Sequence, residues 1–378
     1  MIKILYVIEN IFFGGGERAF AQIIARLNRQ NYQIYVASLP GGLFEEKIRD
    51  HAKIFPFDLR NKFNFANISD LVRIIKENNI DIIHCQGGRG GFFARLAAHK
   101  TNVPLVNTVA MLVEGFNVGL CKKMFYVLLD RFSEKYVDKF IVLSEILKNT
   151  LIEKHKIAKG KIVKITNGVE INNFIADAVS RDKIRNEFSI SADNRLVGFI
   201  GRLTWQKGLT FFLQAIKQIE DNNPELTGNI KYLIVGEGEQ RKELENQAEN
   251  LNIAKKIIFN GFRKDVRDII SALDVLVLPS LREGQPIILL EAMSMGKAII
   301  TTDIEGMNET IENNVNGMLV TPKNGIALAE AIIFSLKNEA AVEKMGVEAR
   351  QSCINKFNID DKVREHERLY ESIIVTRI

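Results

Sequence analysis

The chain has 378 residues, 46% of them hydrophobic and 26% charged, with a formal net charge of +5. This length predicts two domains, and the composition is typical of a soluble globular protein. No apolar run approaches the roughly 18–20 residues that span a bilayer, and the three scattered cysteines, Cys85, Cys121 and Cys353, lack metal-binding spacing and indicate a reducing cytoplasm.

The first half of the chain alternates short apolar runs with amphipathic segments. The apolar runs lie at 2–8, 32–38, 80–84, 104–109 and 139–143, with helical periods between them, for example at 17–27 and 68–77. This alternation predicts a doubly wound parallel sheet. Residues 1–170 carry about 25 basic and about 16 acidic side chains, which indicates either an anionic partner or a solvated charge excess.

Three glycines, Gly14, Gly15 and Gly16, follow the first predicted strand, and Glu17 and Arg18 come directly after them. Glycines let a backbone approach a phosphate closely, and the start of a helix favours anions. The segment lacks the G-x-G-x-x-G spacing of dinucleotide-binding proteins, which disfavours an NAD-dependent oxidoreductase. A tight structural turn explains the three glycines equally well.

Residues 119–139 combine basic and apolar side chains in one helical segment. The apolar residues are Leu120, Phe125, Leu128, Leu129 and Phe132. A basic amphipathic helix can lie on an anionic membrane surface. An ordinary core helix is the alternative, and the sequence leaves both open.

A polar stretch at 167–194, with an Asn-Gly turn at Asn167, separates the first series of strands from a second. The second series lies at 196–200, 232–235, 256–259, 275–278 and 298–301, and predicts another Rossmann-like domain. We therefore expect a first domain at 1–170, a linker at 171–194, a second domain at 195–357, and a helix at 358–378 that packs back on the first domain. Ligands bind at the carboxyl ends of strands in such sheets, so the natural site is a cleft between the domains.

Two cations, Arg202 and Lys207, follow the first strand of the second series. Arginine can clamp phosphate oxygens and lysine supplies a point charge, so the two could neutralise a diphosphate leaving group. The alternative is a solvated basic loop. Gly236 and the Gly261–Phe262 pair also follow strands, although glycine is common in such positions.

Residues 281–296 place two carboxylates, Glu283 and Glu291, on either side of a Gly-Gln-Pro turn and an apolar run. Pro286 suits the first turn of a helix, so Glu283 should lie in a loop and Glu291 on the helix. The N–H groups at a helix start bind anions, phosphate above all. A carboxylate repels a phosphate, so each carboxylate here should bind another group, most simply hydroxyls. A ligand with phosphate beside hydroxyls is typical of a nucleotide sugar.

Taken in order, these motifs resemble those of a retaining glycosyltransferase of family 4. The resemblance rests on Gly-Gly-x-Glu near the start, Asn-Gly-Val at the junction, Gly-Arg-Leu…Lys-Gly, Gly-x-Gly, and Glu-Gly-x-Pro-x-x-x-x-Glu-Ala, and it covers nearly the whole chain. It implies the GT-B fold, an α/β architecture of two Rossmann-like doubly wound domains that face each other across a cleft.

The resemblance implies a role for each motif residue. Arg202 and Lys207 would bind the donor diphosphate, Glu291 the ribose hydroxyls, and Glu283 the donor sugar; Glu283, Arg202 and Lys207 would carry catalysis. The remaining donor-binding positions would be Gly15, Gly16, Gly236, Gly261, Phe262, Gly284, Gln285, Pro286 and Ile287. No metal or other cofactor is expected, because cations and backbone amides would replace it.

One departure concerns the acceptor side, where Ala110 stands in place of a histidine that the family often carries. Some relatives lack this histidine and carry Glu-Gly soon after, and Glu114 with Gly115 fits that variant. His84 is a second acceptor-side candidate, although a lone histidine beside a strand is more often structural.

The expected reaction transfers a hexosyl or N-acetylhexosaminyl group from a nucleotide sugar to a glycan or lipid-linked hydroxyl in surface polysaccharide or lipopolysaccharide synthesis. A UDP-sugar is the first expectation and GDP-mannose the second. We expect the enzyme in the cytoplasm, where it could also contact the inner face of the plasma membrane. No nucleic-acid partner is expected. A nucleotide-sugar epimerase of the same fold and a non-catalytic nucleotide-sugar binder are the alternatives.

Overall fold

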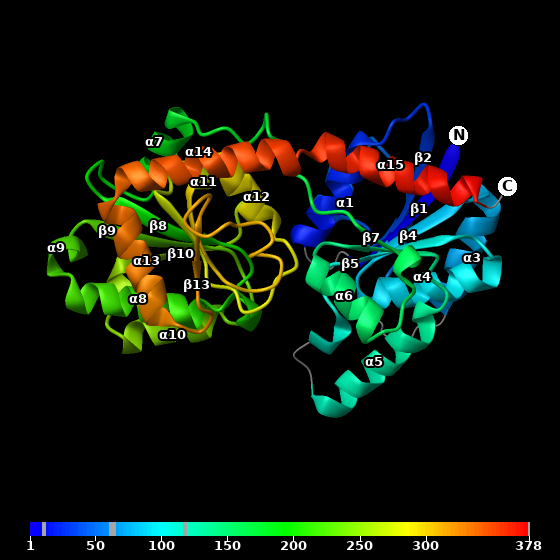
Figure 1. Cartoon of the computed structure of the whole chain (residues 1–378), viewed down its shortest axis with the longest axis horizontal. Coiled ribbons are helices and arrows are strands. Elements are labelled where there is room, and N and C mark those ends of the chain that lie inside the picture. Colours follow the sequence, from blue (N-terminus) through cyan, green and yellow to red (C-terminus); the bar gives the residue numbers. More distant parts are fainter. Residues whose placement is uncertain (10–12, 60–65, 116–118, 377–378) are drawn as a thin grey trace. The chain divides into compact units, whose positions relative to one another are not determined.

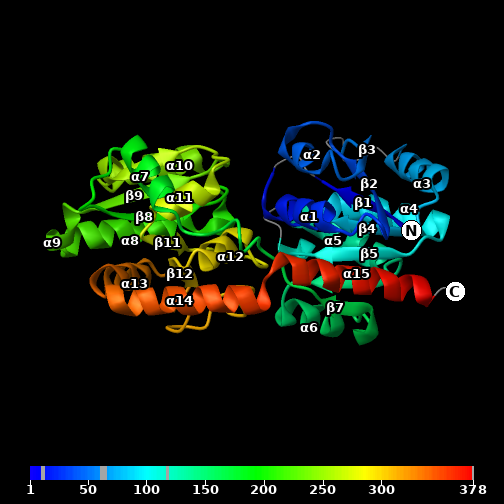
Figure 2. The same ribbon diagram turned by 90° about the horizontal axis from the view of Figure 1, so that it is seen from above.

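The computed structural model describes residues 1–9, 13–59, 66–115 and 119–376. They form two compact units, which Figures 1 and 2 show in two orientations. The first unit contains Met1–Gly168 and Ile359–Ile378, and the second contains Val169–Asn358. Each unit is a parallel sheet with helices on both faces, so the predicted pair of Rossmann-like domains is confirmed.

The first unit is built on a seven-stranded sheet in the order β3-β2-β1-β4-β5-β6-β7. Its strands are β1 (Ile2–Ile8), β2 (Tyr32–Ser38), β3 (Lys53–Pro56), β4 (Ile82–Gln86), β5 (Leu105–Val109), β6 (Lys139–Val142) and β7 (Ile162–Lys164). Its helices are α1 (Gly15–Arg26), α2 (Gly42–Ile48), α3 (Ala66–Asn78), α4 (Gly88–Thr101), α5 (Leu120–Glu134), α6 (Glu145–Glu153) and α15 (Ile359–Val375). Every strand pair is parallel. The central strands are therefore buried on both faces, which is why they are continuous apolar runs.

Two apolar layers cover this sheet. One contains side chains from α3, α4 and α6, and the other contains side chains from α1, α2 and α15. Helix α15 follows the second unit in sequence but lies against α1 in the first (Figure 1). Its Val363, Leu369 and Tyr370 belong to the same core cluster as Phe20 of α1. Both ends of the chain thus belong to the first unit.

The second unit is built on a six-stranded sheet in the order β10-β9-β8-β11-β12-β13. Its strands are β8 (Arg195–Ile200), β9 (Ile230–Val235), β10 (Ile257–Asn260), β11 (Val275–Leu278), β12 (Ala298–Thr302) and β13 (Met318–Val320). Its helices are α7 (Ala178–Glu187), α8 (Leu209–Asn222), α9 (Pro224–Thr227), α10 (Arg241–Asn250), α11 (Val266–Ala272), α12 (Ile287–Ser294), α13 (Gly325–Lys337) and α14 (Glu339–Lys356). The strand order reverses between β8 and β11, the position where doubly wound sheets bind ligands.

The expected linker at 171–194 is wrong. This stretch contains α7, whose Asp177 cap accepts hydrogen bonds from the backbone of Val179 and Ser180. Arg181 of α7 forms an ion pair with Asp274 (2.7 Å), and Ser180 donates a hydrogen bond to Asp268 (3.1 Å). The polar composition of the segment therefore reflects a surface helix of the second unit.

Helix α5 is not the core helix that was one alternative for residues 119–139. Within it, only Ser133 and Glu134 are buried. Leu120, Met124 and Leu128 are 79%, 72% and 67% exposed. Among the described residues no helix is both long and apolar enough to cross a bilayer.

Candidate functional site

The predicted donor residues of the second unit lie at one edge of its sheet. Arg202 follows β8, Gly236 follows β9, Gly261 follows β10 and Glu283 follows β11. These four strands are neighbours in the order β10-β9-β8-β11. The structure therefore gathers residues from four separate motifs at the carboxyl ends of adjacent parallel strands.

Backbone hydrogen bonds join these four loops. The N–H of Gly236 donates to the carbonyls of Asn260 (3.0 Å) and Gly261 (3.1 Å). The N–H of Leu203 donates to Glu237 (2.9 Å), and the N–H of Leu281 donates to Gln206 (2.7 Å). Loops held in this way offer a preorganised surface to a ligand.

Lys207 and Glu283 form an ion pair across two of these loops. Their side chains are 17% and 14% exposed, and the hydroxyl of Ser280 donates to the same Glu283 oxygen (3.1 Å). Gly208 makes the contact possible, because its φ is +64° and a Cβ there would lie 2.1 Å from the carbonyl oxygen of Pro279. The Lys-Gly dipeptide is thus required for packing as well as for charge.

Arg202 differs from Lys207 in its surroundings. Its side chain is exposed, and no other described residue forms a hydrogen bond or ion pair with its guanidinium. Of the two cations predicted to bind phosphate, Lys207 is therefore already neutralised by a carboxylate, whereas Arg202 faces solvent.

The 283–287 loop is fixed by packing against residues after β12. A Cβ on Gly306, whose φ is +81°, would lie 1.3 Å from the carbonyl oxygen of Gly284. The amide of Gln285 donates to the hydroxyl of Thr310 (3.2 Å), so the Gln285 side chain serves the loop itself. Pro286 is the N-cap of α12, and Ile287 begins the helix.

Glu291 is fully buried, at 0% exposure. The reason is that all eight residues of α12 are buried, as its Ile-Ile-Leu-Leu sequence requires. In this structure the Glu291 carboxylate does not reach solvent. Its contact with ribose hydroxyls stays a prediction.

Gly15 and Gly16 begin α1 in the first unit, directly after the N-cap Gly14. The N–H of Gly14 donates to the carboxylate of Glu17 (2.8 Å). Gly16 lies against the end of β4, where a Cβ would fall 2.6 Å from the amide nitrogen of Gln86. The structure thus gives the glycines a packing role, and their contact with a diphosphate stays a prediction.

His84 is fully buried, and both ring nitrogens have partners in the first unit. Nδ1 lies 2.7 Å from the hydroxyl of Tyr370, and Nε2 lies 2.8 Å from the hydroxyl of Thr108. Burial, together with the nearby His366, lowers the pKa of His84 well below its usual value. These contacts favour the structural alternative for His84 over a direct contact with an acceptor.

Glu114 lies on the short 3-10 helix Val113–Gly115, which follows β5. Its side chain is 34% exposed and forms an ion pair with Arg131 of α5 (3.0 Å). Nε2 of His155 lies 3.4 Å from the same carboxylate oxygen. Sequence reasoning missed His155, because its 41-residue separation from Glu114 gave no sign of the contact.

Comparison with known proteins identifies the family. Residues 13–173 match the family model described as Glycosyltransferase Family 4, and residues 180–352 match the model described as Glycosyl transferases group 1. The two matches follow each other along the chain and account for both units. The chain is a glycosyltransferase of this two-domain family.

Two relatives of this glycosyltransferase align along nearly their whole length. The chain is 28% identical to the UDP-Gal:alpha-D-GlcNAc-diphosphoundecaprenol alpha-1,3-galactosyltransferase of Escherichia coli, over 100% of this chain and 98% of that protein. It is 25% identical to the N,N'-diacetylbacillosaminyl-diphospho-undecaprenol alpha-1,3-N-acetylgalactosaminyltransferase of Campylobacter jejuni, over 93% and 94%. Among solved structures, Anabaena HepE in complex with UDP-glucose matches with a TM-score of 0.86 at 22% identity, over 98% of this chain and 100% of that chain. The GT-B fold is therefore confirmed.

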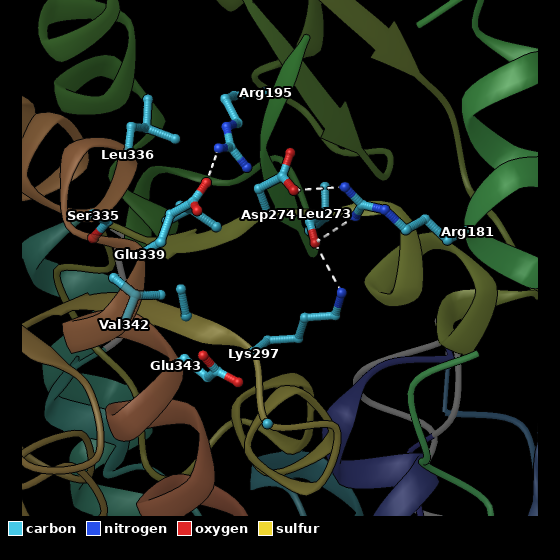
Figure 3. A pocket seen from close by; sticks show the side chains of 13 residues that line it. Arg181, Arg195, Leu273, Asp274, Lys297, Ser335, Leu336, Glu339, Val342 and Glu343 are labelled. Atoms are coloured by element: carbon cyan, nitrogen blue, oxygen red, sulfur yellow. Dashed lines mark hydrogen bonds and ion pairs between the residues drawn. The ribbon is translucent and has the colours of Figure 1, made fainter. Parts of the chain in front are cut away.

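A pocket of about 280 Å³ lies at the opposite edge of the glycosyltransferase's second sheet, where β8, β11 and β12 begin. Figure 3 shows Arg181 and Lys297 pointing toward Leu273 and Asp274. Lys297 donates to the carbonyls of Ser271 (2.8 Å) and Leu273 (2.9 Å), and burial lowers its pKa to about 8. These cations stabilise the carboxyl end of α11, so the pocket has a structural explanation.

Proposed function

We propose that the chain transfers a hexosyl or N-acetylhexosaminyl group from a UDP-sugar, with retention of configuration, to a sugar hydroxyl of a lipid-linked acceptor in surface polysaccharide synthesis. The observation that carries the proposal is the meeting of Arg202, Lys207 and Glu283 at the carboxyl edge of the second sheet. The names of the Escherichia coli and Campylobacter jejuni relatives support the lipid diphosphate acceptor, and the former also supports a UDP-linked donor.

On the donor side, Arg202 meets the diphosphate first, because its guanidinium faces solvent. Lys207 then exchanges part of its contact with Glu283 for a phosphate oxygen, and the Glu283 carboxylate becomes available to a sugar hydroxyl. Both cations, with the N–H groups at the start of α12, stabilise the charge that grows on the departing diphosphate. This arrangement carries the transfer without a metal ion.

On the acceptor side, α5 lies on an anionic membrane surface near the lipid anchor of the acceptor. Its exposed apolar residues are Leu120, Met124, Phe125, Leu128 and Phe132, between 45% and 79% exposed. Lys122 and Lys123 stand on the same helix and supply attraction to anionic headgroups. The site of action is then the cytoplasmic face of the plasma membrane.

The test is a transfer assay with UDP-sugars and GDP-mannose as donors and a lipid diphosphate sugar as acceptor. NMR of the product reports the anomeric configuration. Glu283→Ala and Arg202→Ala should each lower turnover at saturating donor by about 100-fold or more, because both act on the developing charge or the reacting sugar. Glu225→Ala and Arg267→Ala, which remove exposed charges elsewhere in the second unit, are the matched controls.

Near wild-type turnover in both site variants would contradict the donor-site assignment. An epimerised donor with no glycosylated product would establish the epimerase alternative. An inverted product would overturn the retaining mechanism and leave the glycosyltransferase assignment intact.

A further inference from the structure

Four ionisable side chains meet beside the carboxyl end of β5 in the first unit. Glu114 belongs to the 3-10 helix after β5, Arg131 and Glu134 belong to α5, and His155 follows α6. Nδ1 of His155 lies 2.5 Å from Oε1 of Glu134, while its Nε2 lies 3.4 Å from Oε1 of Glu114. The imidazole thus stands between two carboxylates.

This cluster is buried at one end and accessible at the other. The side chains of His155 and Glu134 are 1% and 6% exposed, whereas Glu114 is 34% exposed. A buried imidazole hydrogen-bonded to a buried carboxylate has a fixed orientation, as in the histidine–aspartate pairs of hydrolases. Glu134 therefore orients His155, and His155 presents its second nitrogen to Glu114.

Two polar atoms in the cluster lack a hydrogen-bond partner among the described residues. They are Nε2 of His155 and Oε2 of Glu114, and both are buried. The 3.4 Å separation of His155 and Glu114 is short enough for charge attraction, but it is not a hydrogen bond. Buried polar groups are almost always paired, so a small movement of the Glu114 side chain would bring its carboxylate into hydrogen-bond contact with Nε2 of His155.

Within the first unit, the cluster lies at the carboxyl edge of the sheet. Glu114 follows β5, and ligands of doubly wound sheets bind at the carboxyl ends of strands. Ala110, also after β5, offers no polar side chain. The contacts of Glu114, His155 and Glu134 given above are all within the first unit.

We propose that His155, oriented by Glu134, positions Glu114 to accept a hydrogen bond from the sugar hydroxyl that attacks the donor. Arg131 holds the Glu114 carboxylate in place through their ion pair. The acceptor oxygen forms the new bond to the anomeric carbon, the bond from that carbon to the diphosphate breaks, and the hydroxyl proton leaves its hydrogen bond to Glu114 and passes to the departing diphosphate. Glu114 orients the hydroxyl, and His155 and Glu134 are positioning residues; this inference rests on the proposed transferase function.

The kinetic test compares His155→Gln, Glu134→Gln and Glu114→Gln with His99→Gln, which makes a matched substitution at an exposed histidine of the same unit. The first three should lower kcat/KM for the acceptor by about tenfold or more, while donor KM and acceptor-free hydrolysis of the donor stay within about twofold.

Equal losses in transfer and acceptor-free hydrolysis would overturn the proposal in favour of a structural role. A second measurement requires no reaction. The ring resonances of His155, assigned by their absence in His155→Gln, are compared by NMR at one pH in the wild type, Glu114→Gln and Glu134→Gln. Their chemical shifts should change in both variants; unchanged chemical shifts in Glu114→Gln would overturn the contact even if the chain proves not to be a transferase.

Discussion

At the scale of single residues, the contact between Lys207 and Glu283 affects how a loss of activity in a Glu283 variant is interpreted. The two side chains form a mostly buried ion pair. Removing one member of such a pair leaves an uncompensated charge, so loss of activity in a Glu283 variant includes an effect on Lys207. The Arg202 variant is free of this coupling and reports the role of positive charge more directly.

Gly208 offers a test of the backbone beneath that pair. Gly208→Ala should weaken UDP binding and lower the free energy of unfolding by about 1–3 kcal/mol, because alanine is strained at positive φ and its Cβ would clash with Pro279. Urea unfolding and UDP titration measure the two effects. Gly228→Ala is the control, since Gly228 has a φ of −72° and open space at its Cβ position. Equal stability of the two variants would contradict the close approach.

The sequence predicted those parts of the candidate site whose residues all lie within one local motif. The loop position of Glu283 and the cations after β8 followed from strand-end motifs. The ion pair of Lys207 with Glu283 joins residues 76 positions apart, and no local pattern contains that contact. The same reason hid the His155 cluster, which three separate elements assemble.

Among the helices and strands, α15 is attached to the first sheet by a buried chain of hydroxyls and one imidazole. The hydroxyl of Tyr370 lies 2.8 Å from that of Tyr6 and 2.7 Å from Nδ1 of His84, whose Nε2 reaches Thr108. Hydrogen bonds among buried groups of this kind specify one docked position for the helix.

The imidazole in this hydrogen-bonded series should make the docking of α15 sensitive to acid. Burial lowers the pKa of both His84 and His366, so the folded protein keeps them neutral below the usual value of 6.5. The unfolded chain binds those protons as the pH falls through about 6.5, so the free energy of unfolding should decline there. Thermal unfolding from about pH 7.5 to about pH 5.5 should show a smaller decline in His84→Asn than in the wild type or in His99→Asn. Equal slopes in all three would contradict this prediction.

The strands show where sequence reasoning succeeds. The interior strands β1, β2 and β11 have the predicted bounds, because burial on both faces gives a continuous apolar run. The strands it missed, β3, β7 and β13, are three or four residues long and lie at sheet edges. An edge strand has one neighbour, and so short a segment leaves little pattern to detect.

At the scale of the whole chain, the first half holds both the excess of positive charge and the exposed apolar side chains of α5. Residues 1–170 hold the excess of basic side chains, and α5 in that half exposes apolar side chains. The sequence left two alternatives for residues 119–139, and the lack of burial in α5 removes the core helix. Membrane contact itself stays a proposal.

Vesicle sedimentation tests that proposal. The wild type should sediment with anionic vesicles and less with neutral ones, and added salt should weaken the binding. Met124→Glu with Leu128→Glu should abolish binding, because both side chains would enter the headgroup layer. Val179→Glu, at a 76% exposed position in the second unit, is the control. Salt-independent binding, or equal binding by the double variant, would contradict a role for α5.

The position of α15 has a consequence for synthesis on the ribosome. The first unit begins with Met1 but is completed only by Ile359–Ile378, after Val169–Asn358 has been made. At about 5–20 residues per second that interval lasts roughly ten to forty seconds. During it, the apolar face that later receives Leu369, Tyr370 and Ile373 has no covering helix. Until α15 has been translated, the nascent first unit therefore exposes an apolar surface of the kind that chaperones bind.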